Sequence, residues 1–266
     1  MFPRITVLMS IYNCADTLRD AIDSLYNQTY KNFKLVLCDD GSSDDTYQIA
    51  KEYASKYNNI TLLKNDINLR LAASLNKCLE YADTEYIARM DGDDISLPTR
   101  FEKEIAFLDD NQNFSIVSCA MIHFDEDGDW GESKPNSFPD KYTFKKGTPH
   151  AHAACMVRTS VIKEVSGYTV SKYLVRGQDY YLWYKIYKIG YKGHNISEPL
   201  YKMRDDKNAL HRRTFINRYK SFVIRVEVLN GLNIPFSFFY ALPTLLKGFV
   251  PRALMNKVRR FRMISK

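Results

Sequence analysis

The stretch that decides the fold is Tyr86-Ile87-Ala88-Arg89-Met90-Asp91-Gly92-Asp93-Asp94-Ile95-Ser96-Leu97-Pro98. A short apolar run ends at Asp91, and a glycine that permits a tight turn lies among the carboxylates. Pro98 suits the opening of the next helix. We interpret the segment as a strand that delivers carboxylates to its C-terminal edge, where open α/β sheets bind ligands. Clustered carboxylates favour a hard divalent cation, so the segment predicts metal-assisted phosphate chemistry; an acidic turn is the alternative.

Strand-like and helix-like segments alternate through the N-terminal third. Short apolar runs predict strands at residues 5–9, 33–38 and 60–63, and apolar residues at helical spacing predict helices over 18–25, 50–57 and 71–82. Ser43 is a suitable N-cap for the second helix. With the strand that ends at Asp91, this alternation predicts a parallel sheet joined by right-handed crossovers.

A second acidic pair, Asp39-Asp40, ends the second predicted strand. In a parallel sheet this pair and the Asp91 cluster open onto the same edge, which predicts one site. The sequence has no GxGxxG after its first strand and no GxxxxGK[ST]. These absences disfavour a dinucleotide dehydrogenase or a P-loop kinase. They are compatible with a nucleotide that is bound through a metal ion on its diphosphate, since such binding needs neither loop.

Composition indicates an ordinary globular protein of 266 residues with 45% hydrophobic residues, enough for one large α/β domain with an appendage. Its five cysteines form no CxxC pair and fit a reducing cytoplasm. No apolar stretch of secretory length follows the N-terminus, so we expect no signal peptide.

The net charge of +7 lies entirely in the tail: residues 228–266 hold seven Lys and Arg and no acid, and the other 227 residues are neutral. Residues 215–229 predict an amphipathic helix closing near Gly231, with its apolar face at Phe215, Tyr219, Phe222, Val223, Val226 and Leu229. The aromatic run at 235–243 is too broken for a spanning helix. Aromatics followed by cations suit an anionic lipid surface. The alternatives are completion of the core and a homodimer contact; nucleic-acid binding is disfavoured by the neutral remainder.

Six segments together resemble family 2 glycosyltransferases of the GT-A fold: residues 5–13, 24–30, 36–46, 72–76, 90–94 and 177–183. The resemblance implies a mostly parallel, Rossmann-like α/β sheet flanked by helices. It implies a catalytic domain over 1–204, with a nucleotide-binding part at 1–97 and an acceptor-binding part at 98–204. Residues 205–266 then form a helical C-terminal extension.

The same resemblance implies roles in donor binding. Tyr12, Asp39 and Asp40 would hold the base, since a carboxylate accepts the N3 hydrogen of uracil and an aromatic face supports the ring. Asp93 would bind the metal, and Asp91 would contact the ribose or the metal. The alternative for Tyr12 is a half-buried aromatic at a strand end, and for one of the aspartates a carboxylate at a helix N-terminus.

In the second half, Asp179 matches the general base, at the start of a helix whose apolar face includes Leu182, Ile186 and Ile189. Three further residues are candidates for acceptor or diphosphate contacts: His150, His152 and Gln178. The alternative for each histidine is a purely structural role. Gln178 stands where the family usually has Glu.

Arg70 stands where the family commonly has glycine, so it either enters the nucleotide site or lies on the surface. The QxxRW motif of processive members is absent, which favours transfer of a single sugar.

The sequence therefore predicts an inverting glycosyltransferase that requires Mn²⁺ or Mg²⁺. The expected donor is a UDP-hexose or UDP-N-acetylhexosamine, and the expected acceptor is a glycan or a polyprenyl-diphosphate-linked glycan of capsule or O-antigen. We expect the protein in the cytoplasm, peripheral on the inner face of the membrane. The alternatives are a catalytically silent GT-A protein that binds carbohydrate or membrane, and a sugar nucleotidyltransferase, which should carry a Gly-rich loop.

Overall fold

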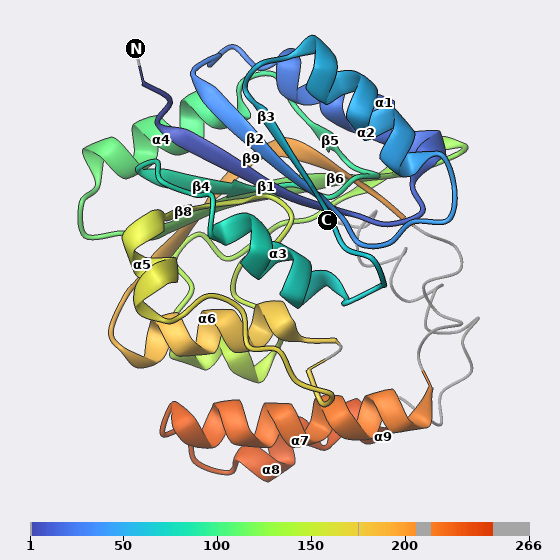
Figure 1. The fold of residues 1–266 in the computed structure, drawn as a ribbon. Helices are drawn as coiled ribbons and strands as arrows, with labels where there is room; N and C mark the ends of the chain where they lie inside the picture. Colours follow the sequence, from blue (N-terminus) through green and yellow to red (C-terminus); the bar gives the residue numbers. More distant parts are fainter. Residues whose placement is uncertain (1, 175, 206–213, 247–266) are drawn as a thin grey trace.

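The computed structural model describes residues 2–174, 176–205 and 214–246, and shows one central sheet with helices on both faces (Figure 1). Its strands run in the order β3-β2-β1-β4-β8-β6-β9-β5, and β7 pairs with β6. A further helical layer, α7 to α9, packs beneath α6. The α/β class predicted from the sequence is confirmed.

The N-terminal half follows the predicted alternation. Its strands are β1 (Ile5–Ile11), β2 (Phe33–Asp39), β3 (Ile60–Lys64) and β4 (Tyr86–Arg89), and they pair with one another in parallel. The helices between them are α1 (Ala15–Tyr26), α2 (Thr46–Lys56) and α3 (Leu71–Leu79). The C-terminal ends of β1, β2 and β4 therefore meet at one edge.

The predicted cap of α2 is wrong. The helix begins at Thr46 with Asp45 in the capping position, where it makes no side-chain cap hydrogen bond. The backbone N–H of Ser43 donates to Asn13 Oδ1 at 2.9 Å. Ser43 thus ties the β2–α2 loop to the β1–α1 turn, ahead of the helix.

The second half adds antiparallel strands to the sheet. Its elements are β5 (Ile95–Ser96), α4 (Arg100–Asp110), β6 (Ile116–Asp125), β7 (Gly128–Glu132), η1 (Lys141–Lys145), β8 (Cys155–Arg158), α5 (Thr159–Glu164), α6 (Gln178–Lys188) and β9 (Gly193–Arg204). β8 lies antiparallel between β4 and β6. Pro98 does not open α4, because the helix begins at Arg100 after Thr99.

Two apolar clusters cover the two faces of the sheet. Neighbouring residues of β1 point to opposite sides: Val7 packs in the cluster that includes α1 and α4, and Leu8 in the cluster that includes α3, α5 and α6. Each fully buried aliphatic side chain stabilises the fold by roughly 1.5–3 kcal/mol. Ile189, which we expected on the buried face of α6, is exposed because it follows the last turn of the helix.

The C-terminal layer consists of α7 (Phe215–Gly231), α8 (Ser237–Ala241) and α9 (Pro243–Leu246). The predicted helix and its end at Gly231 are confirmed, but the predicted apolar face is mostly wrong. Ile224, Val228 and Leu229 are buried, whereas the side chains of Phe215 and Tyr219 are exposed. The face with Ile224 and Val228 points inward because Gly231 packs closely on α6. A Cβ added at Gly231 would lie 2.1 Å from Tyr184 Oη.

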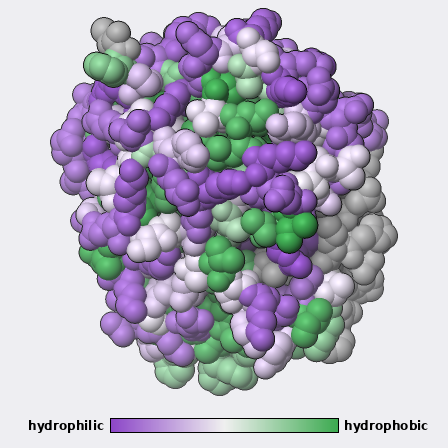
Figure 2. Space-filling view, in the orientation of Figure 1, coloured by the Kyte–Doolittle hydropathy of each residue, from purple (hydrophilic) through white to green (hydrophobic). Residues whose placement is uncertain are grey.

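The aromatic residues of 235–243 do not complete the core: Phe236, Phe238 and Phe239 are each more than half exposed, at 73%, 52% and 66%. Hydrophobic residues appear at the lower end of the molecule, over the C-terminal helices (Figure 2). The basic tail at 247–266 lies outside the described residues.

Candidate active site

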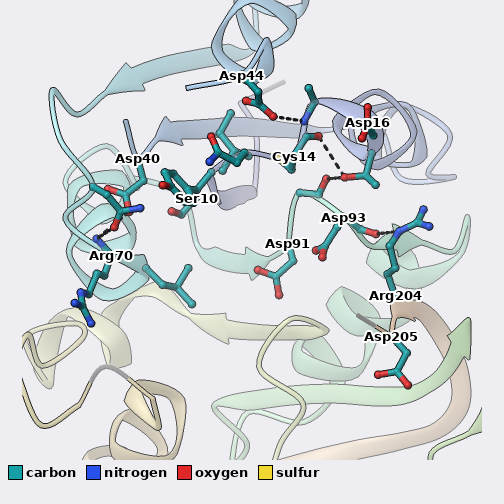
Figure 3. A pocket seen from close by; sticks show the side chains of 18 of the residues that line it. Ser10, Cys14, Asp16, Asp40, Asp44, Arg70, Asp91, Asp93, Arg204 and Asp205 are labelled. Atoms are coloured by element: carbon teal, nitrogen blue, oxygen red, sulfur yellow. Dashed lines mark hydrogen bonds between the residues drawn. The ribbon is translucent and has the colours of Figure 1, made fainter. Parts of the chain in front are cut away.

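A cleft of about 940 Å³ opens at the edge where β1, β2 and β4 end. Five predicted donor-site residues line it: Tyr12, Asp40, Arg70, Asp91 and Asp93. Figure 3 shows Asp91 and Asp93 side by side, with Asp40 and Arg70 on one side of them and Arg204 and Asp205 on the other. The acidic clusters that follow β2 and β4, the two strands on either side of β1, therefore both contribute to one cleft, as the parallel arrangement predicts.

The turn that carries Asp91 and Asp93 is packed tightly on the β1–α1 connection. An added Cβ at Gly92 would lie 2.9 Å from Cys14 Sγ, so this position has room only for glycine. Thr17 Oγ1 donates to the Gly92 carbonyl at 3.0 Å. The two carboxylates are thus presented on a short, braced turn.

Burial, together with the charge of Asp91, raises the pKa of Asp93. A cation between the two carboxylates would relieve this repulsion, so these residues suit a divalent metal. Within the described part of the chain, no group of three or more His, Cys, Asp or Glu side chains is arranged to hold a metal ion. The remaining ligands would therefore come from water and from donor phosphates, as is usual for Mg²⁺.

Asp94 braces the turn from inside the protein. Its carboxylate accepts hydrogen bonds from Tyr201 Oη at 2.9 Å and from the Arg204 backbone N–H at 2.8 Å. Burial, with Asp91 and Asp93 nearby, raises the pKa of Asp94 to about 8. Arg204, which we did not predict, also donates from Nε to the Asp93 carbonyl at 3.0 Å. No sequence motif marked it.

Arg89 is a second site residue that we did not predict. It is buried in β4 and donates to the Asp91 carboxylate and to the Met90 carbonyl. Because a buried guanidinium is costly without a partner, this ion pair fixes the Asp91 side chain. The signal was present in the sequence as an arginine inside an apolar strand.

Asp40 has a role that the sequence did not predict. Its Oδ1 accepts from Asn65 Nδ2 at 2.9 Å, from the Leu69 N–H at 2.8 Å and from Ser74 Oγ at 2.9 Å. Its Oδ2 accepts from the Arg70 N–H at 2.8 Å. Asp40 thus holds the 68–70 loop against the cleft.

Arg70 adopts φ 74°, a conformation that glycine tolerates better than any other residue. Its side chain lines the cleft. The hydrogen bond from the Arg70 N–H to Asp40 holds this unfavourable backbone in place at the cleft wall.

Asp39 is buried at the end of β2, and its two carboxylate oxygens differ. Oδ2 accepts from the Ser42 N–H at 3.3 Å. Oδ1 is buried and has no hydrogen-bond partner among the residues that the structure describes. A buried acceptor without a partner costs about 1–3 kcal/mol, and a ligand N–H would satisfy it.

Asp179 lies in the first turn of α6, half-buried and outside the lining of the large cleft. Burial raises the pKa of its carboxyl, the Tyr180 N–H and the Arg89 charge lower it, and the Asp91 charge raises it. The carboxylate therefore lies within electrostatic range of the cleft aspartates. Neighbouring Gln178 has a buried Oε1 with no partner in the described part of the chain.

Neither His150 nor His152 belongs to the lining of the cleft. Both ring nitrogens of His150 are occupied, Nδ1 by Asn195 Oδ1 at 2.7 Å and Nε2 by Tyr187 Oη at 2.9 Å. We interpret His150 as a core residue and do not retain it as an acceptor contact. His152 Nε2 contacts Tyr168 Oη at 2.8 Å, and burial with the Arg89 charge lowers the pKa of His152 to about 3.

Comparison with known proteins identifies the family. The model of glycosyl transferase family 2 matches residues 6–166. The chain belongs to this family. EpsE of Bacillus subtilis (strain 168) is 40% identical over 99% of this chain and 95% of its own length. WfaP of Escherichia coli, a UDP-Glc:alpha-D-GlcNAc-diphosphoundecaprenol beta-1,3-glucosyltransferase, is 26% identical over 91% of this chain and 94% of its own.

Solved structures share the GT-A architecture of this family 2 chain. Staphylococcus aureus TarS in complex with UDP has a TM-score of 0.68 at 18% identity, covering 92% of this chain and 70% of TarS. The mannosyltransferase PcManGT of Pyrobaculum calidifontis, solved with GDP-Man and Mn²⁺, has a TM-score of 0.63 at 19% identity, covering 97% of this chain and 79% of its own. The predicted GT-A fold is confirmed.

Proposed function

We propose that this family 2 glycosyltransferase inverts configuration and transfers one hexose or N-acetylhexosamine from a UDP-sugar. Its proposed acceptor is a polyprenyl-diphosphate-linked glycan in capsule or O-antigen synthesis, in line with the acceptor that the name of WfaP states. The observation that carries the proposal is the division of carboxylates: Asp91 and Asp93 face the cleft, and Asp179 lies apart on α6.

The donor side would use residues that line the cleft together with Asp39, which is buried at the end of β2 and is not part of the lining. Asp39 Oδ1, a buried acceptor with no partner among the described residues, suits the N3–H of uracil, and half-exposed Tyr12 offers a ring face. Asp93 and Asp91 would hold Mn²⁺ or Mg²⁺ together with the donor diphosphate. The metal would supply Lewis-acid stabilisation of the leaving diphosphate. Arg70 and Arg204 add positive charge at the cleft wall.

Asp179 would act as the general base. The acceptor hydroxyl gives its proton to the Asp179 carboxylate as the oxygen attacks the anomeric carbon from the face opposite the diphosphate. The bond to the diphosphate breaks and its electrons leave with UDP, so a single base is sufficient for inversion. A pKa raised by burial makes the carboxylate a stronger base than an exposed aspartate.

The C-terminal layer would hold the enzyme at the inner face of the membrane. α7 and α8 expose Phe215, Tyr219, Phe238 and Phe239, and the chain beyond residue 246 is basic. Aromatics at the interface and cations near anionic lipid both favour peripheral binding. No helix among the described residues is long and apolar enough to cross a bilayer.

The test is calorimetric titration with UDP, GDP, CDP and dTDP, each with and without Mn²⁺, on the native protein and an Asp93→Ala variant. We expect UDP to bind only with the metal, and the variant to lose this binding while remaining folded. Binding to another nucleotide alone would change the proposed donor. A folded protein that binds none of the four would refute the enzyme and favour the silent carbohydrate- or membrane-binding alternative.

A further inference from the structure

A second cavity, of about 340 Å³, lies between the start of α6 and the C-terminal layer. Its charged lining consists of three arginines: Arg176, Arg218 and Arg225. No Asp or Glu belongs to the lining that the structure describes, and Thr148 and Ser221 add hydroxyl groups. Three guanidinium groups around a small cavity give it a positive potential that suits an anion.

Arg225 is held rigidly in this cavity. Its Nη2 donates to the Lys145 carbonyl at 2.8 Å, and its guanidinium lies 5.6 Å from the centre of the Tyr180 ring. Its Nε is buried and has no hydrogen-bond partner among the described residues. A buried donor without a partner requires an explanation, and a ligand oxygen would provide one.

The cavity adjoins both the catalytic base and the donor cleft. Gly177 and Tyr180, on either side of Asp179 in the sequence, line it, so the base lies within one helical turn of the cavity wall. Arg176 lines both this cavity and the large cleft. An anionic group bound here would therefore lie beside the place where an acceptor hydroxyl meets Asp179.

The other wall belongs to the helices that expose aromatic residues. Arg218 and Ser221 are on α7, and Thr244 is on α9. α7 exposes Phe215 and Tyr219 to solvent. The cavity thus lies between the base and the apolar surface of the layer.

We propose that this arginine cavity binds the diphosphate of the lipid-linked acceptor and so places the acceptor sugar at Asp179. The inference rests on the proposed function and adds the acceptor site to it. Arginine suits this task because its planar fork donates two parallel hydrogen bonds to a phosphate. The N-terminal N–H groups of α6 favour the same charge. A phospholipid headgroup offers similar chemistry, and the test separates the two sources.

The first experiment compares two acceptors that carry the same sugar, one on a short prenyl diphosphate and one on a neutral alkyl chain. The variants are Arg218→Gln, which removes a charge, and Ser221→Glu, which adds an acid. Lys220→Gln is the matched control, since it removes a charge from the same helix outside the cavity. We expect both variants to raise KM at least tenfold for the diphosphate acceptor only, and the control to change neither KM. Equal effects on both acceptors, or none, would overturn the proposal.

The second experiment measures binding without catalysis. Farnesyl diphosphate is titrated in EDTA, so that metal-dependent binding in the donor cleft is suppressed, and phosphatidylglycerol vesicles form a separate arm. We expect farnesyl diphosphate to bind the native protein and the control, and to bind both variants at least tenfold more weakly. Loss of vesicle binding alone would assign the cavity to a headgroup and refute the acceptor site.

The two experiments separate the two proposals. Arginine-dependent binding of farnesyl diphosphate by a protein that transfers no sugar would refute the proposed enzyme and keep the anion site. Sugar transfer with the same KM for the diphosphate acceptor and the neutral acceptor would keep the proposed enzyme and refute the anion site.

Discussion

Asp40→Asn tests whether the carboxylate of Asp40 holds the cleft loop. An asparagine at this position can keep its amide oxygen at Oδ1, but its NH₂ then faces the Arg70 N–H, which now donates to Oδ2 at 2.8 Å. One hydrogen bond to a charged acceptor is lost, at about 1.5–3 kcal/mol. The Arg70 N–H keeps its second hydrogen bond, to Asn68 Oδ1 at 3.1 Å. We expect a destabilisation of about 2 kcal/mol.

Thermal unfolding measures this loss directly. For a chain of this size each kcal/mol lowers Tm by about 2–4 °C, so the variant should melt about 4–8 °C below the native protein. Asp45→Asn is the matched control, because Asp45 is exposed at the start of α2 and makes no side-chain cap hydrogen bond. The control should leave Tm unchanged.

Binding of UDP separates a loop-holding role from a direct contact with the base. If Asp40 acts through the loop, Ser74→Ala should weaken UDP binding as well, because Ser74 Oγ donates to Asp40 at 2.9 Å and Ser74 is buried outside the cleft lining. The reasoning is refuted if Asp40→Asn abolishes UDP binding at an unchanged Tm while Ser74→Ala binds UDP normally.

Three further outcomes are expected. Asp179→Asn should slow transfer by about 10²–10⁴-fold at unchanged UDP affinity, and in the native enzyme kcat/KM should rise with pH through a pKa above 3.8, as steady-state kinetics would show. Gly92→Ala should weaken metal-dependent UDP binding in calorimetry, because its Cβ would displace Cys14 Sγ from 2.9 Å. Arg100→Met should destabilise the fold by about 3–5 kcal/mol at pH 8, since it leaves buried Glu104 without its cation. Burial raises the pKa of Glu104 to about 7 in the folded protein. The folded state is therefore favoured while Glu104 is protonated, below its unfolded pKa, and this contribution is lost as the pH rises through 7. Urea unfolding should accordingly show a smaller loss of stability for Arg100→Met at about pH 5 than at about pH 8.

The parallel half of the fold could be predicted because its signals are local. Each strand is a short apolar run, each helix has an apolar stripe, and the acidic pairs mark strand ends at one edge. The position of β8 between β4 and β6 could not be predicted, since antiparallel insertion depends on contacts between segments about 30 to 70 residues apart in the chain. The buried face of α7 was predicted wrongly for a related reason. The prediction followed the aromatic row of the helix, whereas the close packing of Gly231 on Tyr184 brings the row with Val228 towards α6.

The site shows the same division between local and distant signals. Asp91 and Asp93 stand out because three acids in four residues are rare in a strand end. Asp40 also stood out, yet its function depends on Asn65, Leu69 and Ser74, which only the folded loop brings to it. Arg204 carries no motif and enters the cleft because β9 ends there. Residue type marked the candidate carboxylates, and the tertiary contacts determine which of their oxygens is left for a ligand.

The bracing of the acidic turn joins the two halves of the catalytic domain. Asp94 accepts from Tyr201 and from the Arg204 backbone, both in β9, and β5 pairs with the same strand. The turn that carries Asp91 and Asp93 is therefore positioned by a strand of the second half, and β4 pairs on one side with β8. A boundary at residue 97 would separate the turn from the groups that fix it and would expose an edge of the sheet. The nucleotide-binding part that we propose at 1–97 therefore belongs to one folding unit with the rest of the sheet, and changes along β9 should be felt at the proposed donor metal site.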